Sequence, residues 1–175
     1  MIDLTSTPII ILAILGTVGV ALPVINIALK EKGSVISYGY VTLIALFASI
    51  GYVLYQLALD HVAPAALFSQ DVLVDDAFGA LFAIAMLIVA IFTTVGSFNY
   101  MKNKDNPSIY FSLILLSAIG MVLVAYSTDL VMLFIAWELM SIPTYVLVGF
   151  LKKDPISNEA AIKYFLFGAL SSAII

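Results

Sequence analysis

Long stretches that are nearly free of charged side chains recur along this sequence, and they limit its possible folds more than any other feature. A helix that crosses the hydrocarbon layer of a membrane, about 30 Å thick, needs roughly 20 mostly apolar residues. Six such stretches are present, at residues 8–29, 37–58, 77–99, 108–127, 130–151 and 157–175. The sequence therefore predicts an all-α, polytopic membrane bundle with about six transmembrane helices.

The overall composition supports a membrane protein and excludes several other classes. Hydrophobic residues make up 63% of the chain and charged residues 10%, whereas a soluble domain has about a quarter charged residues. A net charge of -4 provides no basic stripe to neutralise phosphates, which argues against nucleic acid as a partner. The chain has no cysteine, and its single histidine, His61, has no second ligand spaced near it, so we predict neither disulfides nor a metal site.

The fourth and fifth stretches are separated by one short polar break, formed by Ser127, Thr128 and Asp129. A single helix over residues 109–151 would be about twice as long as the membrane is thick. We therefore expect these two stretches to form a helical hairpin that turns at the polar break.

The lysines predict how the bundle is oriented, because short loops rich in lysine stay on the cytoplasmic side. The loops after the first, third and fifth stretches carry Lys30 and Lys32, Lys102 and Lys104, and Lys152 and Lys153. The intervening loops carry aspartates and no lysine. We therefore expect the N-terminus on the outer side, where residues 59–76 form an extracytoplasmic loop whose apolar part lies at the interface as a short helix or hairpin.

The chain shows no fixed short repeat and no linker rich in proline, glycine or serine, so residues 1–175 are predicted to form a single transmembrane bundle. The last stretch ends without the polar residues that usually finish a helix at the interface. Either this helix ends abruptly, or the last helix is truncated and the chain is the front part of something longer.

Glu138 is the most informative residue, because it lies near the middle of the fifth stretch, about 12 Å from its outer end. A charge at this depth costs about 2.5 to 3.5 kcal/mol on insertion scales, so such residues usually have a function. Ser141 and Tyr145 share its face, and Pro143 removes a backbone donor one turn away. We interpret Glu138 as a proton-binding carboxyl; the alternative is a permanently protonated residue that joins two helices.

Lys163 lies about 9 Å inside the cytoplasmic end of the final stretch, with Ser171 two turns further on a similar face. It is either a titratable relay or a lysine whose long side chain extends to the interface. Its depth differs from that of Glu138 by roughly 10 Å, which argues against a direct ion pair between them. A proton passing between the two would need bridging water, hydroxyl groups or another ionisable residue.

Three segments resemble a known family when they are taken together. They are IGMVLVAYSTDL at residues 119–130, AWELMSIPTYVL at 136–147 and EAAIKYFLFGALSSA at 159–173. The chain is similar in these segments to the antiporter-like membrane subunits of respiratory complex I, and above all to subunits of the subunit N type. The resemblance covers residues from about 76 to the end.

The resemblance implies a site and an architecture. In that family the fifth helix carries a proton-handling glutamate, which the motif places on Glu138, and the sixth carries a lysine, which it places on Lys163. Ser141, Pro143, Tyr145 and Ser171 are then supporting residues. Family members resemble a fourteen-helix bundle of two inverted five-helix repeats, and this chain stops inside the sixth helix, so the resemblance implies an N-terminal fragment.

The implied function is that of a proton-translocating membrane-arm subunit in a complex-I-like oxidoreductase, with NAD(P)H, F420H2 or ferredoxin as donor and a quinone-type acceptor. This chain carries no cysteine cluster and no nucleotide-binding glycine motif, so no cofactor is expected in it. Quinone, flavin and iron-sulfur centres are expected in partner subunits, with other membrane-arm subunits and lipid as partners. We expect a prokaryotic plasma membrane rather than an organellar inner membrane.

Three alternatives remain open at this point. An Mrp-type sodium/proton antiporter subunit and a membrane-bound hydrogenase subunit share much of the motif that contains Glu138 and Lys163. A scaffold that transports nothing is a third, in which Glu138 stays protonated and structural.

Overall fold

The structure is a computed structural model that describes residues 6–28, 34–59, 65–66 and 72–174. In these residues the chain forms six helices, which confirms the predicted all-α bundle. They are α1 (Thr7–Ala28), α2 (Val35–Ala58), α3 (Ala77–Met101), α4 (Pro107–Tyr126), α5 (Leu130–Val148) and α6 (Pro155–Ser172). The break at residues 127–129 separates α4 from α5, so the predicted hairpin is correct.

Five of the described helices, α1 to α5, are long and apolar enough to cross a membrane. Helix α6 is the least apolar of the six because its first half carries Ser157, Asn158, Glu159 and Lys163. The sixth predicted span is therefore present as a helix, but its composition is more polar than that of the other five.

Polar residues at the predicted breaks start the helices. Asp76 accepts a hydrogen bond from Gly79 N at 2.7 Å at the start of α3, and Asp129 accepts two from the first turn of α5. Asp154 accepts one from Ile156 N at the start of α6. A carboxylate at this position satisfies free backbone donors and interacts favourably with the helix dipole, so these aspartates fix where each helix begins.

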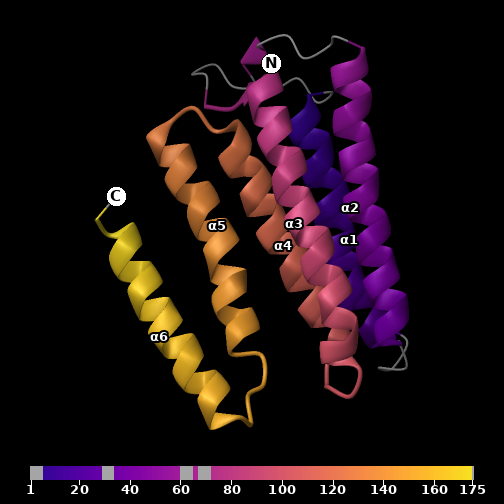
Figure 1. Ribbon diagram of the computed structural model, residues 1–175, viewed down its shortest axis with the longest axis vertical. Coiled ribbons are helices and arrows are strands. Elements are labelled where there is room, and N and C mark those ends of the chain that lie inside the picture. Colours follow the sequence, from indigo (N-terminus) through magenta and orange to yellow (C-terminus); the bar gives the residue numbers. More distant parts are fainter. Residues whose placement is uncertain (1–5, 29–33, 60–64, 67–71, 175) are drawn as a thin grey trace.

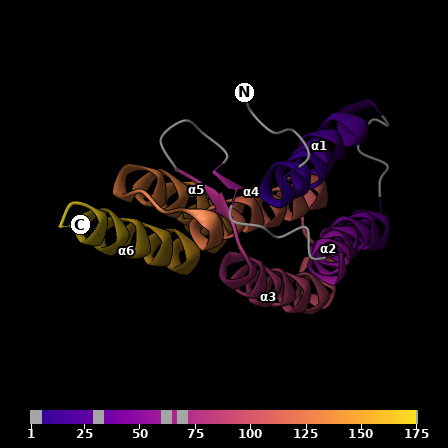
Figure 2. The ribbon, with the colours of Figure 1, turned by 90° about the horizontal axis from the view of Figure 1, so that it is seen from above.

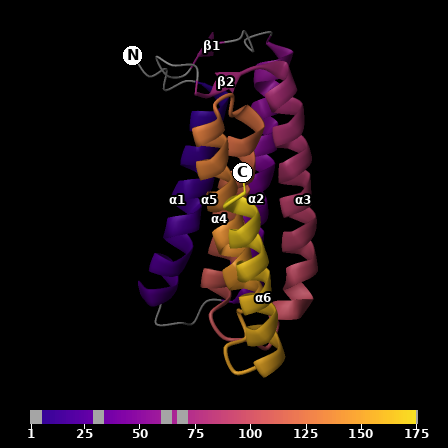
Figure 3. The same ribbon diagram turned by 90° about the vertical axis from the view of Figure 1, so that its left-hand side faces the viewer.

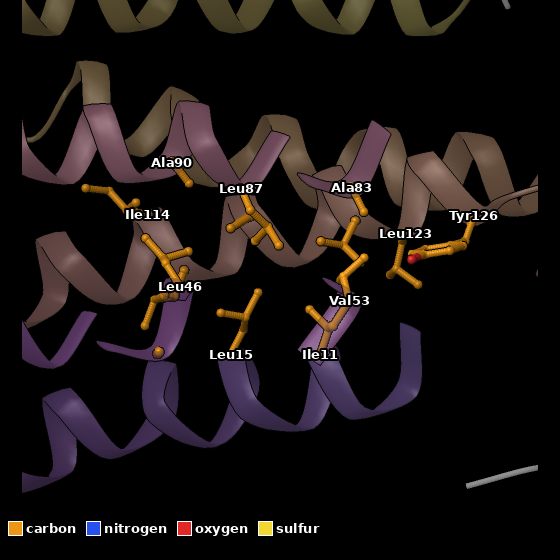
Figure 4. Packing of buried hydrophobic residues seen from close by; sticks show 14 of the residues in the cluster. Ile11, Leu15, Leu46, Val53, Ala83, Leu87, Ala90, Ile114, Leu123 and Tyr126 are labelled. Atoms are coloured by element: carbon orange, nitrogen blue, oxygen red, sulfur yellow. The ribbon is translucent and has the colours of Figure 1, made fainter. Parts of the chain in front are cut away.

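Helix α4 lies in the middle of the bundle, where it packs against α1, α3 and α5. Helix α2 packs between α1 and α3, and α6 lies on the far side of α5 (Figure 1, Figure 2). The core is formed mainly by α1 to α4, with fully buried Ile11, Leu15, Leu46, Leu87 and Leu115 (Figure 4). Helices α5 and α6 consequently turn much of their surface away from the rest of the described chain.

A short antiparallel pair of strands, β1 (Ala65–Ala66) and β2 (Val74–Asp75), lies at one end of the bundle (Figure 3). Leu73 bridges to Ser127, and Thr128 N donates to Val72 O at 3.1 Å. These bonds attach the segment before α3 to the turn between α4 and α5. Of the two conformations predicted for this loop, the structure shows a strand pairing.

The described lysines agree with the predicted sidedness. The turn after α3, with Lys102 and Lys104, and the turn after α5, with Lys152 and Lys153, lie at the end of the bundle opposite the strand pair (Figure 1). We refer to the end with the strand pair as the outer end. Lys30, Lys32 and His61 lie outside the described residues.

Candidate functional site

The backbone of α5 next to Glu138 rests directly on α4. A Cβ atom added at Gly120 of α4 would lie 2.6 Å from Met140 Cα and 2.8 Å from the Leu139 carbonyl carbon. Ser117, one turn earlier on α4, donates a hydrogen bond to Met140 O at 3.0 Å. Because only glycine permits this approach, Gly120 sets the position of the α5 segment that carries the candidate carboxyl.

Glu138 is half-buried, and its Oε1 atom is shielded from solvent without a hydrogen-bond partner among the described residues. A buried carboxyl oxygen without a partner is unfavourable by about 1 to 3 kcal/mol or more. Glu138 forms no ion pair with Lys163, in agreement with the predicted difference in depth. The described part of the chain therefore presents a carboxyl that needs a donor, a cation or a proton of its own.

Ser141 and Pro143 are both buried residues of α5. Ser141 Oγ donates to Trp137 O at 2.8 Å, and Thr144 Oγ1 donates to Ser141 O at 2.7 Å. Pro143 has no N–H, so the Leu139 carbonyl lacks its ordinary helical donor. The hydroxyl groups around Pro143 therefore bond to backbone carbonyls of their own helix.

Tyr145 connects α5 to α6. Its ring lies edge-on to Tyr164 and Phe165, with ring centroids 5.0 and 5.7 Å away. A Cβ atom at Gly168 would lie 2.7 Å from Tyr145 Cζ, so the phenol lies against a residue that has no side chain. Gly168 of α6 therefore packs against Tyr145 of α5.

The burial of two serine side chains of α6 differs from what the predicted site implies. Ser171, predicted as a supporting residue, is exposed and donates to Phe167 O of its own helix at 2.8 Å. Ser172, which was not among the predicted site residues, is 8% exposed, and its Oγ has no hydrogen-bond partner among the described residues. The hydroxyl that α6 turns inward is therefore that of Ser172.

Lys163 forms an ion pair with Glu159 of the same helix, and their side chains are 64% and 66% exposed. The pair therefore lies on the surface that the described residues form. In contact with water such a pair contributes about 1 kcal/mol or less. If lipid covers the pair, each charge lowers the free-energy cost of placing the other in apolar surroundings.

Neutralising one member of this pair should therefore lower the amount of protein in the membrane more than neutralising both members does. We expect Glu159→Gln or Lys163→Met alone to lower the amount of full-length protein in the membrane, because an unpaired charge costs up to about 2.5 to 3.5 kcal/mol in a span. The double variant should recover most of that loss. Immunoblots of membrane fractions measure the amount of protein in each variant. If the loss in the double variant equals the sum of the two single losses, the two charges act independently.

No group of three or more histidine, cysteine or acidic side chains that could hold a metal occurs in the described ranges. The site consists of the Glu138 carboxyl on α5, the Gly120 contact that positions it, and the Tyr145 contact with α6.

Comparison with known proteins identifies the kind of subunit. The membrane family described as NADH:quinone oxidoreductase/Mrp antiporter matches residues 127–175, the region of α5 and α6. NADH-quinone oxidoreductase subunit N 1 of Solibacter usitatus is 37% identical over 167 residues, which are 94% of this chain and 32% of that protein. F(420)H(2) dehydrogenase subunit N of Methanosarcina mazei is 37% identical over 109 residues, 62% of this chain and 22% of that protein.

A solved structure has the same fold. A chain of respiratory complex I from Thermus thermophilus superimposes with a TM-score of 0.72 and 26% identity over 93% of this chain and 34% of that one. The chain spans about a third of the length of these relatives. From its motif, its bundle and these similarities, the chain is a member of the antiporter-like membrane subunits, of the subunit N type.

Proposed function

We propose that this chain belongs to a proton-translocating membrane-arm subunit of a complex-I-like oxidoreductase. One observation supports this most strongly: α5 carries a carboxyl in the apolar part of the bundle whose Oε1 has no partner among the described residues. The motif around Glu138 also lies in the segment that matches the NADH:quinone oxidoreductase/Mrp antiporter family. The donor is NAD(P)H, F420H2 or ferredoxin, and the acceptor is a quinone-type molecule.

The proposed mechanism is electrostatic. A positive charge that approaches a buried carboxyl favours loss of its proton, and a charge that withdraws favours protonation. Charge displacement in a neighbouring subunit, driven by electron transfer elsewhere, would thus make Glu138 release or accept a proton. Lys163 and Glu159 form a second charged group on α6, from which a proton reaches Glu138 only through intervening water or hydroxyl groups.

The partner subunits, cofactors and cellular location are part of the same proposal. The partners are other antiporter-like and small membrane-arm subunits, together with lipid around the outward surfaces of α5 and α6. Flavin, iron-sulfur centres and quinone are assigned to partner subunits, and this sequence has no cysteine to bind an iron-sulfur centre. The location is the plasma membrane of a prokaryote.

A sodium/proton antiporter subunit of the Mrp type, or a hydrogenase-linked one, is the second candidate, because the family that matches α5 and α6 includes Mrp antiporters. A purely structural Glu138 is less well supported, because its carboxyl forms no hydrogen bond to a neighbouring described helix.

Proton transport in proteoliposomes that contain the purified complex separates the candidates. We expect acidification of the lumen when electron donor and quinone are added, at the same rate with sodium or choline as the salt. A protonophore should abolish the signal. Transport that requires sodium and proceeds without electron donor would favour the antiporter, and no transport under either condition would contradict both.

A further inference from the structure

A buried polar cluster lies at the outer end of the bundle, far from Glu138 along the chain. Asp75 of β2 is 5% exposed, and its Oδ2 accepts a hydrogen bond of 2.7 Å from Thr7 N at the start of α1. The two residues are 68 positions apart. A carboxylate of β2 thus caps the first turn of α1 and satisfies one of its free backbone donors.

Four side-chain oxygens in this region have no hydrogen-bond partner among the described residues: Asp75 Oδ1, Ser6 Oγ, Thr7 Oγ1 and Tyr126 Oη. Each belongs to a residue that is at most 7% exposed. Buried polar groups in proteins nearly always have a partner, either another residue or an ordered water. Four such oxygens in one region therefore need partners that the described residues do not supply.

These oxygens come from three segments that meet. Ser6 and Thr7 lie next to each other at α1, and Thr7 is bonded to Asp75. The Tyr126 ring packs under the start of α3, where a Cβ atom on Gly79 would lie 2.7 Å from Tyr126 Cδ1. The bridge between Leu73 and Ser127 places the segment that ends in Asp75 beside the end of α4, where Tyr126 lies. Figure 4 shows this ring in the core beside Leu123.

The charge of Asp75 also lacks a counterion in the described chain. Lys102, Lys104, Lys152 and Lys153 lie at the opposite end of the bundle, and Lys163 is paired with Glu159. The neighbouring charged residue is another acid, Asp76, which caps α3. A buried carboxylate in this situation needs donors, and water supplies two per molecule.

We propose that one or two ordered water molecules occupy the outer end of the bundle, held by Asp75, Thr7, Ser6 and Tyr126. No two of the four oxygens form a hydrogen bond with each other. Water accepts from the Tyr126 hydroxyl and donates to Asp75 Oδ1, so it satisfies both. Water-mediated hydrogen bonds would then connect α1, β2 and α4.

A cavity lies next to this cluster. It is partly open, has a volume of about 250 Å³ and lies between the start of α3 and the end of α4, lined in part by Asp76, Tyr126, Ser127 and Thr128. Tyr126 borders this cavity and also belongs to the buried cluster. This inference does not depend on the proposed proton translocation.

The sign of a stability change tests the proposal in the full-length polypeptide within its purified membrane complex. Tyr126→Phe and Thr7→Val each remove a hydroxyl and nearly keep the side-chain volume. If waters bind there, each change should lower the thermal midpoint, because it takes a partner from a water. If the site is dry, each should raise the midpoint, because it removes an unsatisfied buried oxygen. The latter result would overturn the proposal.

The double variant gives a second, independent measure. Tyr126 and Thr7 make no hydrogen bond with each other, so in a dry site their effects should add, whereas a shared water cluster should make the combined loss smaller than the sum. Tyr55→Phe is the control, because Tyr55 is 59% exposed on α2 and should leave the midpoint unchanged.

Direct observation completes the test and does not depend on any variant folding. A high-resolution cryo-EM map of the unmodified complex should show density bridging Asp75 Oδ1 and Tyr126 Oη at hydrogen-bond distances. A direct bond between these atoms, a metal ion at shorter distances, or an empty site in a map that resolves other internal waters would contradict the proposal.

Discussion

Replacing Glu138 with Gln is expected to reduce donor-driven proton translocation by about tenfold or more, since a positioned proton-transfer group contributes roughly 10²–10⁴ in rate. The amide has nearly the same shape as the carboxyl, so the side chain fits the same position on α5. It cannot exchange a proton in the physiological range, and it needs no counterion. The measurement is lumen acidification in proteoliposomes, normalised to the amount of assembled complex.

The matched control is Ser171→Ala on α6. The Ser171 side chain is exposed and bonds only to its own helix, so translocation should remain at the level of the unmodified protein. Unchanged translocation in the Glu138→Gln complex would remove the basis of the proposed function. It would instead favour a glutamate that is structural.

Gly120→Ala is expected to cause the largest loss of stability of any single methyl addition in the part of α4 that meets α5. The new Cβ would lie 2.6 Å from Met140 Cα, and backbone atoms cannot move aside as a flexible side chain can. Overpacking costs typically about 1 to 3 kcal/mol, and contact with backbone puts this case at or above about 3 kcal/mol. Thermal unfolding of the purified full-length protein measures the effect.

The control for this change is Gly96→Ala on α3. Nothing lies within 4 Å of a Cβ atom at Gly96, so alanine should be neutral or slightly stabilising there, as it is in most helix interiors. Because Gly120 positions the α5 backbone beside Glu138, we also expect Gly120→Ala to impair translocation in any protein that still assembles. Equal stability of the two alanine variants would show that α5 does not rest on α4 in this way.

Local features of the sequence were sufficient to predict the helices. The length of each apolar stretch reflects the thickness of the membrane, and Asp76, Asp129 and Asp154 cap the helices at the breaks. The depths of Glu138 and Lys163 follow from the rise of a helix, and the structure agrees that these two do not pair.

The faces of α5 and α6 could not be predicted in the same way. Their residues are apolar around most of the circumference, because lipid tolerates apolar side chains where a soluble protein would expose polar ones. Periodicity therefore did not distinguish Ser171, which is exposed, from Ser172, which is buried. The contact of Gly168 with Tyr145 sets the register between these two helices.

The sequence by itself determined which segments are helices, the depth of Glu138 and the family motif, because each depends on neighbouring residues and the thickness of a lipid layer. Tertiary structure alone decided that Gly120 supports α5 and that Asp75 caps a helix that begins 68 residues earlier. Those two facts depend on which segments meet in space, and contacts between distant parts of a chain leave no periodic pattern in its sequence.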